Sequence, residues 1–118
     1  MELTAKLQIR PDAAVLVVVK PADIDLPDLP EWPSPSARTT AEATIGFVLS
    51  STDLPKLTKV YELARLDLVA WVAYPKGGQL DTDLNRDSLA AALVSEGLRP
   101  VRQVAIDDVW SALRFRPA

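Results

Sequence analysis

Three apolar stretches of the chain dominate its pattern of hydrophobic and polar positions. They cover residues 13–20, 43–50 and 68–74, and each has the length of a β-strand. An apolar run without polar alternation is typical of a parallel strand that is buried on both faces. The run at 68–74, which ends at Pro75 and Lys76, is predicted to be the central strand.

Helical periodicity follows the second and third of these strands. One apolar face predicts a helix over about residues 54–66, with Asp53 as its cap and Pro55 in its first turn. A second helix is predicted to begin at Asn85, a favourable N-cap, and to end at Gly97, which tolerates the left-handed backbone of a helix stop. The apolar face of the first helix consists of Leu57, Val60, Tyr61 and Ala64.

Two further strands are predicted near the end of the sequence, at residues 101–106 and 110–116. The Asp107-Asp108 turn between them indicates an antiparallel hairpin. Residues 1–118 are therefore predicted to form a single Rossmann-like α/β domain. Its sheet is expected to have five strands, mostly parallel, in the spatial order 1-2-3-5-4, with only the last strand reversed.

Residues 21–42 are predicted to form a long proline-rich loop, because proline interrupts helical hydrogen bonding. The apolar residues of this loop predict that it packs across one face of the sheet in place of a missing helix, and a mobile flap over a pocket is the alternative. The prolines are Pro21, Pro27, Pro30, Pro33 and Pro35, and the apolar residues are Ile24, Leu26, Leu29 and Trp32.

The composition narrows the chemistry that the chain can perform. The sequence contains no cysteine and no histidine, which excludes disulfides, thiolate and imidazole catalysis, and zinc sites built on these residues. Only oxygen ligands remain for a metal ion. Four aspartates could supply them, but their spacing matches no calcium loop, so neither a metal nor a cofactor is predicted. These aspartates are Asp81, Asp83, Asp107 and Asp108.

Charge and hydropathy also limit the partners and the location. The net charge of −3 argues against a nucleic-acid partner, because such partners are attracted by a positive field. No apolar segment reaches the ~20 residues needed to span a bilayer. The N-terminus lacks the charged-then-apolar pattern of a signal peptide, so a cytoplasmic protein is expected.

Polar and aromatic residues gather at one edge of the predicted sheet, the C-terminal rim, where its second, third and fourth strands end. Open α/β sheets bind ligands at this edge, so a non-catalytic site for a small molecule or a protein partner is predicted there. The candidate ligand-binding residues are Tyr74, Lys76, Thr82, Asp83, Asp107, Trp110 and Arg114.

Other roles for these residues remain open. Lys76 could form an ion pair with Asp83 or Asp107 that only holds the loops together. The same three residues could instead serve a small enzyme, as nucleophile or as general acid and base. Residues 109–116 alternate between two faces, which places Arg114 on the same face as Trp110. A guanidinium on an inner strand is expected to pair with an acidic neighbour, and an anionic ligand is the alternative.

The later half of the chain also resembles a known protein family. The motifs that carry the resemblance are WVAYPK at residues 71–76, TDL at 82–84 and AIDDVWSALRF at 105–115. They resemble the domain of unknown function 3052, a family of small bacterial proteins. The resemblance implies a bacterial source and a shared fold, but no activity.

The predicted topology is also similar to the later half of class I methyltransferases. Such enzymes carry a glycine-rich loop after their first strand, whereas this chain has Lys20-Pro21-Ala22-Asp23. The likeness therefore implies no residue that binds S-adenosylmethionine. A degenerate methyltransferase-like binding domain remains an alternative function.

Overall fold

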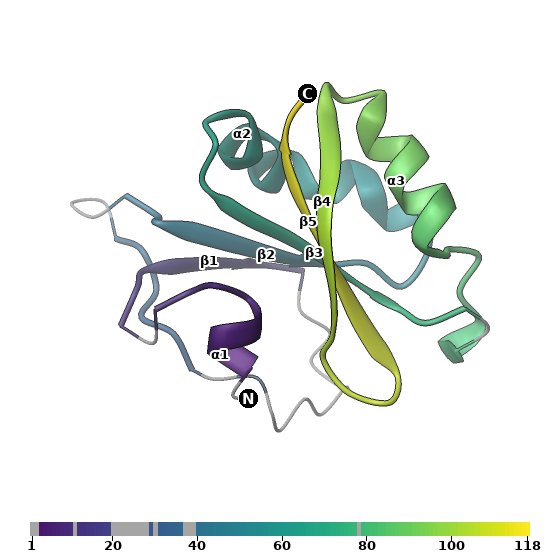
Figure 1. The fold of residues 1–118 in the computed structure, drawn as a ribbon, viewed down its shortest axis with the longest axis horizontal. Coiled ribbons are helices and arrows are strands. Elements are labelled where there is room, and N and C mark those ends of the chain that lie inside the picture. The colour runs from purple at the N-terminus through teal and green to yellow at the C-terminus, as the bar shows by residue number, and fades with distance from the viewer. Residues whose placement is uncertain (1–2, 11, 20–28, 30, 37–39, 78) are drawn as a thin grey trace.

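A five-stranded mixed sheet forms the middle layer of the molecule (Figure 1). The computed structural model describes residues 3–10, 12–19, 29, 31–36, 40–77 and 79–118. The strands lie in the order β1 (Val15–Val18), β2 (Ala43–Phe47), β3 (Val69–Pro75), β5 (Trp110–Pro117), β4 (Leu98–Ala105). Strands β1, β2 and β3 are parallel, and β5 is antiparallel to both β3 and β4. This result confirms the predicted strand order, the reversed last strand and the C-terminal hairpin.

Helices cover the two faces of the sheet unequally (Figure 1). Of the helices in the described residues, one face carries α2 (Thr58–Arg65) and α3 (Arg86–Val94), and the other carries the short α1 (Leu3–Lys6). Two 3-10 helices lie in connections, η1 (Ser51–Leu57) and η2 (Gln79–Asp81). The radius of gyration, 13.2 Å, is that of a compact chain of about this length. In the described residues, no helix is long and apolar enough to cross a membrane.

The central strand β3 is buried on both faces, as predicted, and it separates two hydrophobic cores. Val72 and Tyr74 face the core under α2 and α3, which we name the helical core. Trp71 and Ala73 face the second core, which we name the N-terminal core because the segment after α1 covers it. The indole Nε1 of Trp71 donates a hydrogen bond of 2.8 Å to the carbonyl oxygen of Leu7. This buried bond attaches the N-terminal segment to the central strand.

The helix predicted over residues 54–66 consists of two parts. Residues 51–57 form the 3-10 helix η1, and the α-helix starts only at Thr58. Asp53 does not cap the helix; its Oδ2 accepts a hydrogen bond of 2.9 Å from the backbone N–H of Leu49. This bond, partly opposed by burial and aided by Lys56, lowers the pKa of Asp53. The predicted cap was therefore wrong, because the carboxylate points back to the end of the preceding strand.

Gly46 allows the first helix to lie close to the sheet. A Cβ atom at this position would lie 2.8 Å from Leu57 Cδ2 and 2.9 Å from Val60 Cγ2. Contacts that short are repulsive, so a larger residue would push the helix away from β2. Packing of α2 on the sheet thus depends on the absence of a side chain at Gly46.

The predicted start of the second helix is confirmed, whereas the helix ends at Val94, three residues before the predicted stop at Gly97. The side chain of Asn85 accepts a hydrogen bond of 2.9 Å from the Ser88 backbone N–H, and the Ser88 hydroxyl accepts one of 3.0 Å from the Asn85 backbone. This reciprocal pair is a capping box. Gly97 has a φ of +80°, the left-handed conformation expected of the stop. Strand β4 begins immediately afterwards at Leu98, three residues earlier than predicted.

The first strand differs from its prediction. It covers only Val15–Val18, and Val17 and Val19 are exposed. A strand buried on both faces was expected, but β1 lies at the edge of the sheet, where few elements can cover it.

Part of the proline-rich loop lies in the described residues. Leu29 and Trp32 pack against the N-terminal core, which agrees with the prediction that the loop covers one face of the sheet. Ile24, Leu26 and the Lys20–Asp23 segment lie outside the described residues.

Candidate functional site

The C-terminal rim brings together the loops that follow β2, β3 and β4. Strand β4 runs parallel to β3, because β5 is antiparallel to both, so all three strands end at this edge. The backbone N–H and the hydroxyl of Ser51 donate hydrogen bonds of 2.8 and 2.5 Å to the carboxylate of Asp83. The backbone N–H of Lys76 donates one of 2.7 Å to the carbonyl of Val109. Hydrogen bonds thus connect the loops of the rim directly.

The polar residues predicted at the rim hold its loops in shape. The bonds from Ser51 lower the pKa of Asp83. Asp107 Oδ1 accepts hydrogen bonds of 2.8 and 2.7 Å from the backbone N–H groups of Val109 and Trp110. The hydroxyl of Thr82 accepts one of 3.1 Å from the backbone N–H of Leu84.

Lys76 does not form the expected ion pair. Neither Asp83 nor Asp107 lies within ion-pair distance of its Nζ, and both carboxylates accept hydrogen bonds from other groups. The interpretation of Lys76 as a tie between these loops was therefore wrong. Within the part of the chain that the structure describes, the half-buried Lys76 side chain has no ion pair or hydrogen bond.

The two aromatic residues predicted at the rim are core residues on opposite faces of the sheet. Tyr74 is 2% exposed in the helical core, and its hydroxyl accepts a hydrogen bond of 3.1 Å from Gln103 Nε2. Burial raises the pKa of Tyr74, so the phenol stays protonated. Trp110 is 1% exposed in the N-terminal core, and the centroid of its ring lies 5.6 Å from that of Phe47 in an edge-to-face contact. The fold therefore does not place Tyr74 and Trp110 in one site.

Arg114 lies apart from the rest of the predicted site. It lies opposite Trp71 of the neighbouring strand β3, and it is four residues from Trp110 along β5. Its Nη1 donates a hydrogen bond of 2.5 Å to Gln8 Oε1, and its buried Nε has no partner. Burial and the nearby positive charges of Arg116 and Arg102 lower its pKa.

The expected ion pair of Arg114 was also wrong. The nearby acid, Asp67, pairs instead with Arg116, through bonds of 2.8 and 2.9 Å. Arg114 and Arg116 are two residues apart and therefore lie on the same face of β5. Asp67 binds Arg116, which is nearer the end of the strand.

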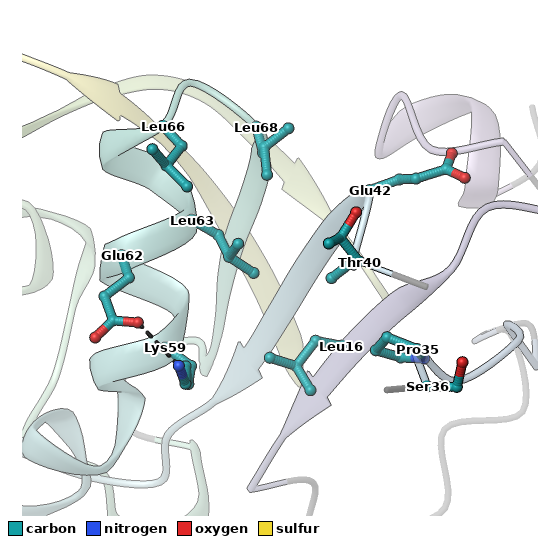
Figure 2. Close-up of a pocket in the computed structure, with 11 residues that line it drawn as sticks. Leu16, Pro35, Ser36, Thr40, Glu42, Lys59, Glu62, Leu63, Leu66 and Leu68 are labelled. Carbon is teal, nitrogen blue, oxygen red and sulfur yellow. Dashed lines mark ion pairs between the residues drawn. The ribbon is translucent and has the colours of Figure 1, made fainter. Parts of the chain in front are cut away.

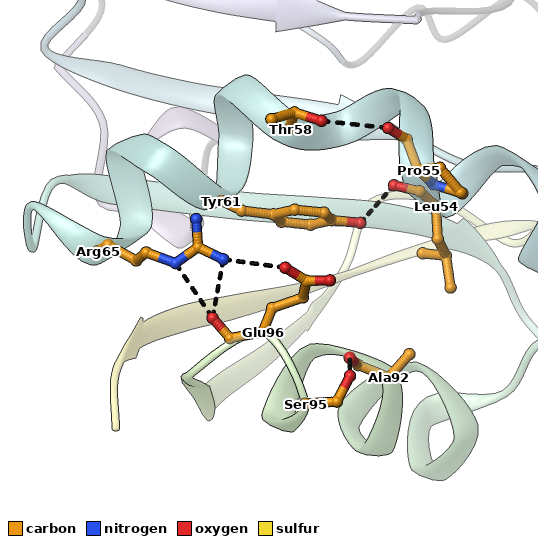
Figure 3. A network of polar contacts seen from close by, with 8 residues as sticks. All are labelled: Leu54, Pro55, Thr58, Tyr61, Arg65, Ala92, Ser95 and Glu96. Carbon is orange, nitrogen blue, oxygen red and sulfur yellow. Dashed lines mark hydrogen bonds and ion pairs between the residues drawn. The ribbon is translucent and has the colours of Figure 1, made fainter.

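The described residues contain no group of three or more acidic side chains placed to hold a metal ion. A small hollow of about 280 Å³ lies between α2 and α3, and three of its polar side chains are hydrogen-bonded to neighbouring groups (Figure 3); they are Tyr61, Ser95 and Glu96. Arg65 donates bonds of 3.1 and 2.9 Å to the carbonyl of Glu96 and one of 2.9 Å to its carboxylate. Tyr61 donates a bond of 2.5 Å to the carbonyl of Leu54, and burial raises its pKa to about 12. This hollow therefore offers few free polar groups to a ligand.

A larger hollow lies elsewhere, between α2 and the edge of the sheet formed by β1 and β2 (Figure 2). Its volume is about 850 Å³. Four leucines, one from β1, one from α2 and two from the short connection between α2 and β3, make its lining mostly apolar, and we name it the leucine pocket. The lining residues are Leu16, Pro35, Ser36, Thr40, Ala41, Glu42, Lys59, Glu62, Leu63, Leu66 and Leu68.

Among the described residues, no helix covers this part of the sheet, which leaves the leucine pocket beside α2. In parallel sheets the connection between two strands usually supplies a helix to one face. Here the described part of the connection between β1 and β2 packs Leu29 and Trp32 on the N-terminal core, which is the other face. Beside α2 the side of β1 that bears Leu16 therefore stays open, and Leu66 is 70% exposed.

The sequence contains a signal for this pocket that the prediction of a single apolar helical face missed. Leu63 and Leu66 are three residues apart and lie outside the apolar face on which the helix was predicted. Residues at this spacing lie side by side on a helix. A second apolar stripe on a short helix indicates a second apolar surface that another segment or a ligand can cover.

Comparison with protein-family models and with curated proteins finds no match to this chain. The resemblance to the domain of unknown function 3052 stays a prediction from its motifs. Support for a functional site on this chain therefore comes from the geometry of its surface hollows and loops.

Proposed function

We propose that this chain is a non-catalytic binding domain whose leucine pocket holds a mostly apolar small molecule. The observation that carries the proposal is an apolar hollow of about 850 Å³ that the described residues leave unfilled. Pockets for small molecules typically have volumes of roughly 300–1,000 Å³ and are lined mainly by apolar side chains. Each Å² of apolar surface removed from water contributes about 25 cal/mol of favourable free energy, so covering Leu63 and Leu66 would favour the binding of a ligand.

The polar residues of the lining support binding rather than chemistry. Lys59 and Glu62 form an ion pair of 3.2 Å at the mouth of the pocket (Figure 2). Glu42 pairs with Arg10 outside the pocket. Since these charges already have partners, the pocket favours a ligand with an apolar body, and Thr40 adds a hydroxyl to the lining for one polar group of that ligand.

The proposal is tested with 1-anilinonaphthalene-8-sulfonate, a fluorescent probe of apolar sites. Leu66→Glu places a charge in the lining, and because Leu66 is exposed, the fold should tolerate the change. The matched control is Val94→Glu at the end of α3, which replaces another exposed apolar residue outside the pocket. We expect Leu66→Glu to weaken probe binding by at least about tenfold and Val94→Glu to leave it unchanged. Equal effects of both variants, or no binding to the unmodified protein, would refute the proposal.

The C-terminal rim is a second candidate site, and the specific observation in its favour is Lys76. Its side chain has no partner in the described part of the chain, and it stands where open α/β sheets bind ligands. This candidate is a site for a small anion, or a small enzyme in which Lys76 acts with Asp83 or Asp107. The engagement of both carboxylates in loop hydrogen bonds favours binding over catalysis.

A panel of small carboxylates and phosphates, followed by thermal shift, tests this second site. Lys76→Ala should abolish any stabilisation that an anion produces, whereas Lys56→Ala, in the neighbouring η1 helix, should not. Titration with S-adenosylmethionine in a calorimeter tests the third candidate, a degenerate methyltransferase-like domain. Absence of heat at high ligand concentration would remove that candidate.

A further inference from the structure

Four arginines stand on one face of the hairpin formed by β4 and β5. Arg99 lies opposite Arg116, and Arg102 lies opposite Arg114. Directly opposed residues of an antiparallel pair point to the same face, and Arg114 and Arg116 alternate with residues of the other face. All four guanidinium groups therefore belong to one surface, which we name the arginine face.

A β-bulge completes this surface. The register shifts between Pro100 and Arg102, so that Val101 is an extra residue in β4. In a regular ladder Arg102 would lie opposite Leu113 and would point to the helical core. The bulge turns Arg102 to the side of Arg114, as bulges do where a strand must re-aim a side chain.

The arginine face is strongly positive in a chain whose total charge is negative. Asp67 is the carboxylate that contacts it, through the two bonds with Arg116. Four positive charges and one negative charge leave +3 on this surface, whereas the whole chain carries −3. Arg116, followed by the charges of Arg114 and Arg99, lowers the pKa of Asp67. Like charges opposite one another in a sheet are destabilising, so the free chain maintains this cluster at a cost in stability.

The arginines retain capacity to bind an anion. Arg99 donates a bond of 3.2 Å to the carbonyl of Pro117, and Arg114 donates to Gln8. Arg102 is exposed and has no partner among the residues described. A guanidinium has five N–H donors, so most of the donors on this face remain free.

Strand β4 adds a second binding feature, because it is the edge of the sheet. No described strand pairs with its outer side. The residues along it are mostly exposed, from Arg99 to Ala105. An unpaired edge offers a row of backbone donors and acceptors to another extended chain, and here Pro100 removes one donor from that row. Charged residues, proline and bulges on an edge also limit uncontrolled pairing, and this bulge in addition brings a further arginine to the charged face.

We infer that the arginine face and the outer edge of β4 bind an extended acidic peptide segment of a partner protein. The peptide adds a strand to the sheet, so that its main chain pairs with β4 and its alternate side chains lie on the arginine face. Aspartate or glutamate at those positions matches the planar donors of the arginines in paired hydrogen bonds. The negative charge of the rest of the chain disfavours a long polyanion such as RNA, which would extend beyond the positive surface.

The probe for this inference is a labelled eight-residue peptide, equal in length to β4, in which glutamate alternates with valine. Arg102→Glu should weaken its binding by at least about tenfold, and the affinity should fall as salt is added. Arg86→Glu, which changes an exposed arginine of α3, is the matched control and should leave binding within about twofold of the unmodified protein. Leu66→Glu should also leave it unchanged, which separates this inference from the proposal for the leucine pocket.

Two further probes decide whether the edge of the sheet takes part. A peptide with the same side chains but with alternate backbone nitrogens methylated cannot pair along one edge, so it should bind far more weakly. Equal binding of both peptides would overturn strand addition. Failure of the acidic peptide to bind at low salt, equal losses in Arg102→Glu and Arg86→Glu, or tighter binding of oligouridylate than of the peptide would overturn the inference as a whole.

Discussion

The C-terminal rim and the leucine pocket differ in how many of their side chains are hydrogen-bonded, ion-paired or buried by other parts of the chain. At the rim, the carboxylates of Asp83 and Asp107 accept hydrogen bonds from neighbouring loops, and Trp110 is packed in the core. At the pocket, the charges are paired, but Leu63 and Leu66 line an open hollow. The rim therefore has chemically reactive side chains whose hydrogen bonds are mostly made within the chain. The pocket has unreactive leucines whose apolar surface is still exposed.

This difference teaches that residue type alone does not mark a site. Aspartate and serine are frequent at strand ends because their side chains bind nearby backbone groups and shape turns. Asp107 at the last hairpin does this. A functional surface is better indicated where the physical requirements of a side chain are not met within the chain. Leu66 and Arg102 fulfil that criterion on two different surfaces.

The largest expected effect concerns Trp110, the rim residue that is also a core residue. Trp110→Ala should lower the free energy of unfolding by about 3–5 kcal/mol, because it removes a fully buried ring and its contact with Phe47. Urea unfolding followed by circular dichroism measures the change. Trp110→Phe keeps part of the ring packing and should cost less. A stable Trp110→Ala variant would return Trp110 to the list of residues available for ligand binding.

Asp107 should show a smaller loss. Asp107→Ala leaves the backbone N–H groups of Val109 and Trp110 without their acceptor, which should lower the free energy of unfolding by about 1–3 kcal/mol. Asp107→Asn retains the Oδ1 acceptor and should recover most of this stability. The same urea titration compares the two variants. If both variants were as stable as the unmodified protein, the turn would not depend on this side chain.

The pH dependence of stability should reveal the bonds of Asp83. Its pKa is lowered in the folded state, so its contribution is present above the ordinary aspartate value of 3.8 and is lost as the pH falls through the lower folded value. Asp83→Asn should therefore reduce stability at neutral pH, and the difference from the unmodified protein should shrink in acid. Unfolding midpoints measured from about pH 7 to about pH 2 test this expectation. A difference that stays constant with pH would contradict it.

The smallest effects are expected at the two side chains without partners. Lys76→Ala and Leu66→Ser should each change the free energy of unfolding by less than about 0.5 kcal/mol, because neither side chain makes a specific contact that the structure describes. Thermal and urea unfolding of both variants provide the measurement. A loss of more than about 2 kcal/mol in Lys76→Ala would mean that the rim depends on this lysine for its structure.

The sequence predicted those parts of the fold that depend on local chemistry. The central run from Leu68 to Tyr74, the N-cap at Asn85 and the left-handed backbone at Gly97 were correct because a strand, a cap and a left-handed turn each require few neighbouring residues. The short helix α1 was missed because its segment has a mixed composition. Leu7 is fully buried in the N-terminal core, and its carbonyl accepts a hydrogen bond from Trp71, 64 residues away in the sequence.

The sequence by itself determined the order of the strands, the hairpin at the end and the absence of thiol and imidazole chemistry, since all of these depend on residue type and spacing. Only the tertiary structure decided which polar residues were already satisfied and where apolar surface stayed open. Asp67 pairs with Arg116 rather than with Arg114, and none of the described helices covers Leu66. Both outcomes depend on contacts between segments far apart in the chain, and such contacts are set by packing rather than by local sequence pattern.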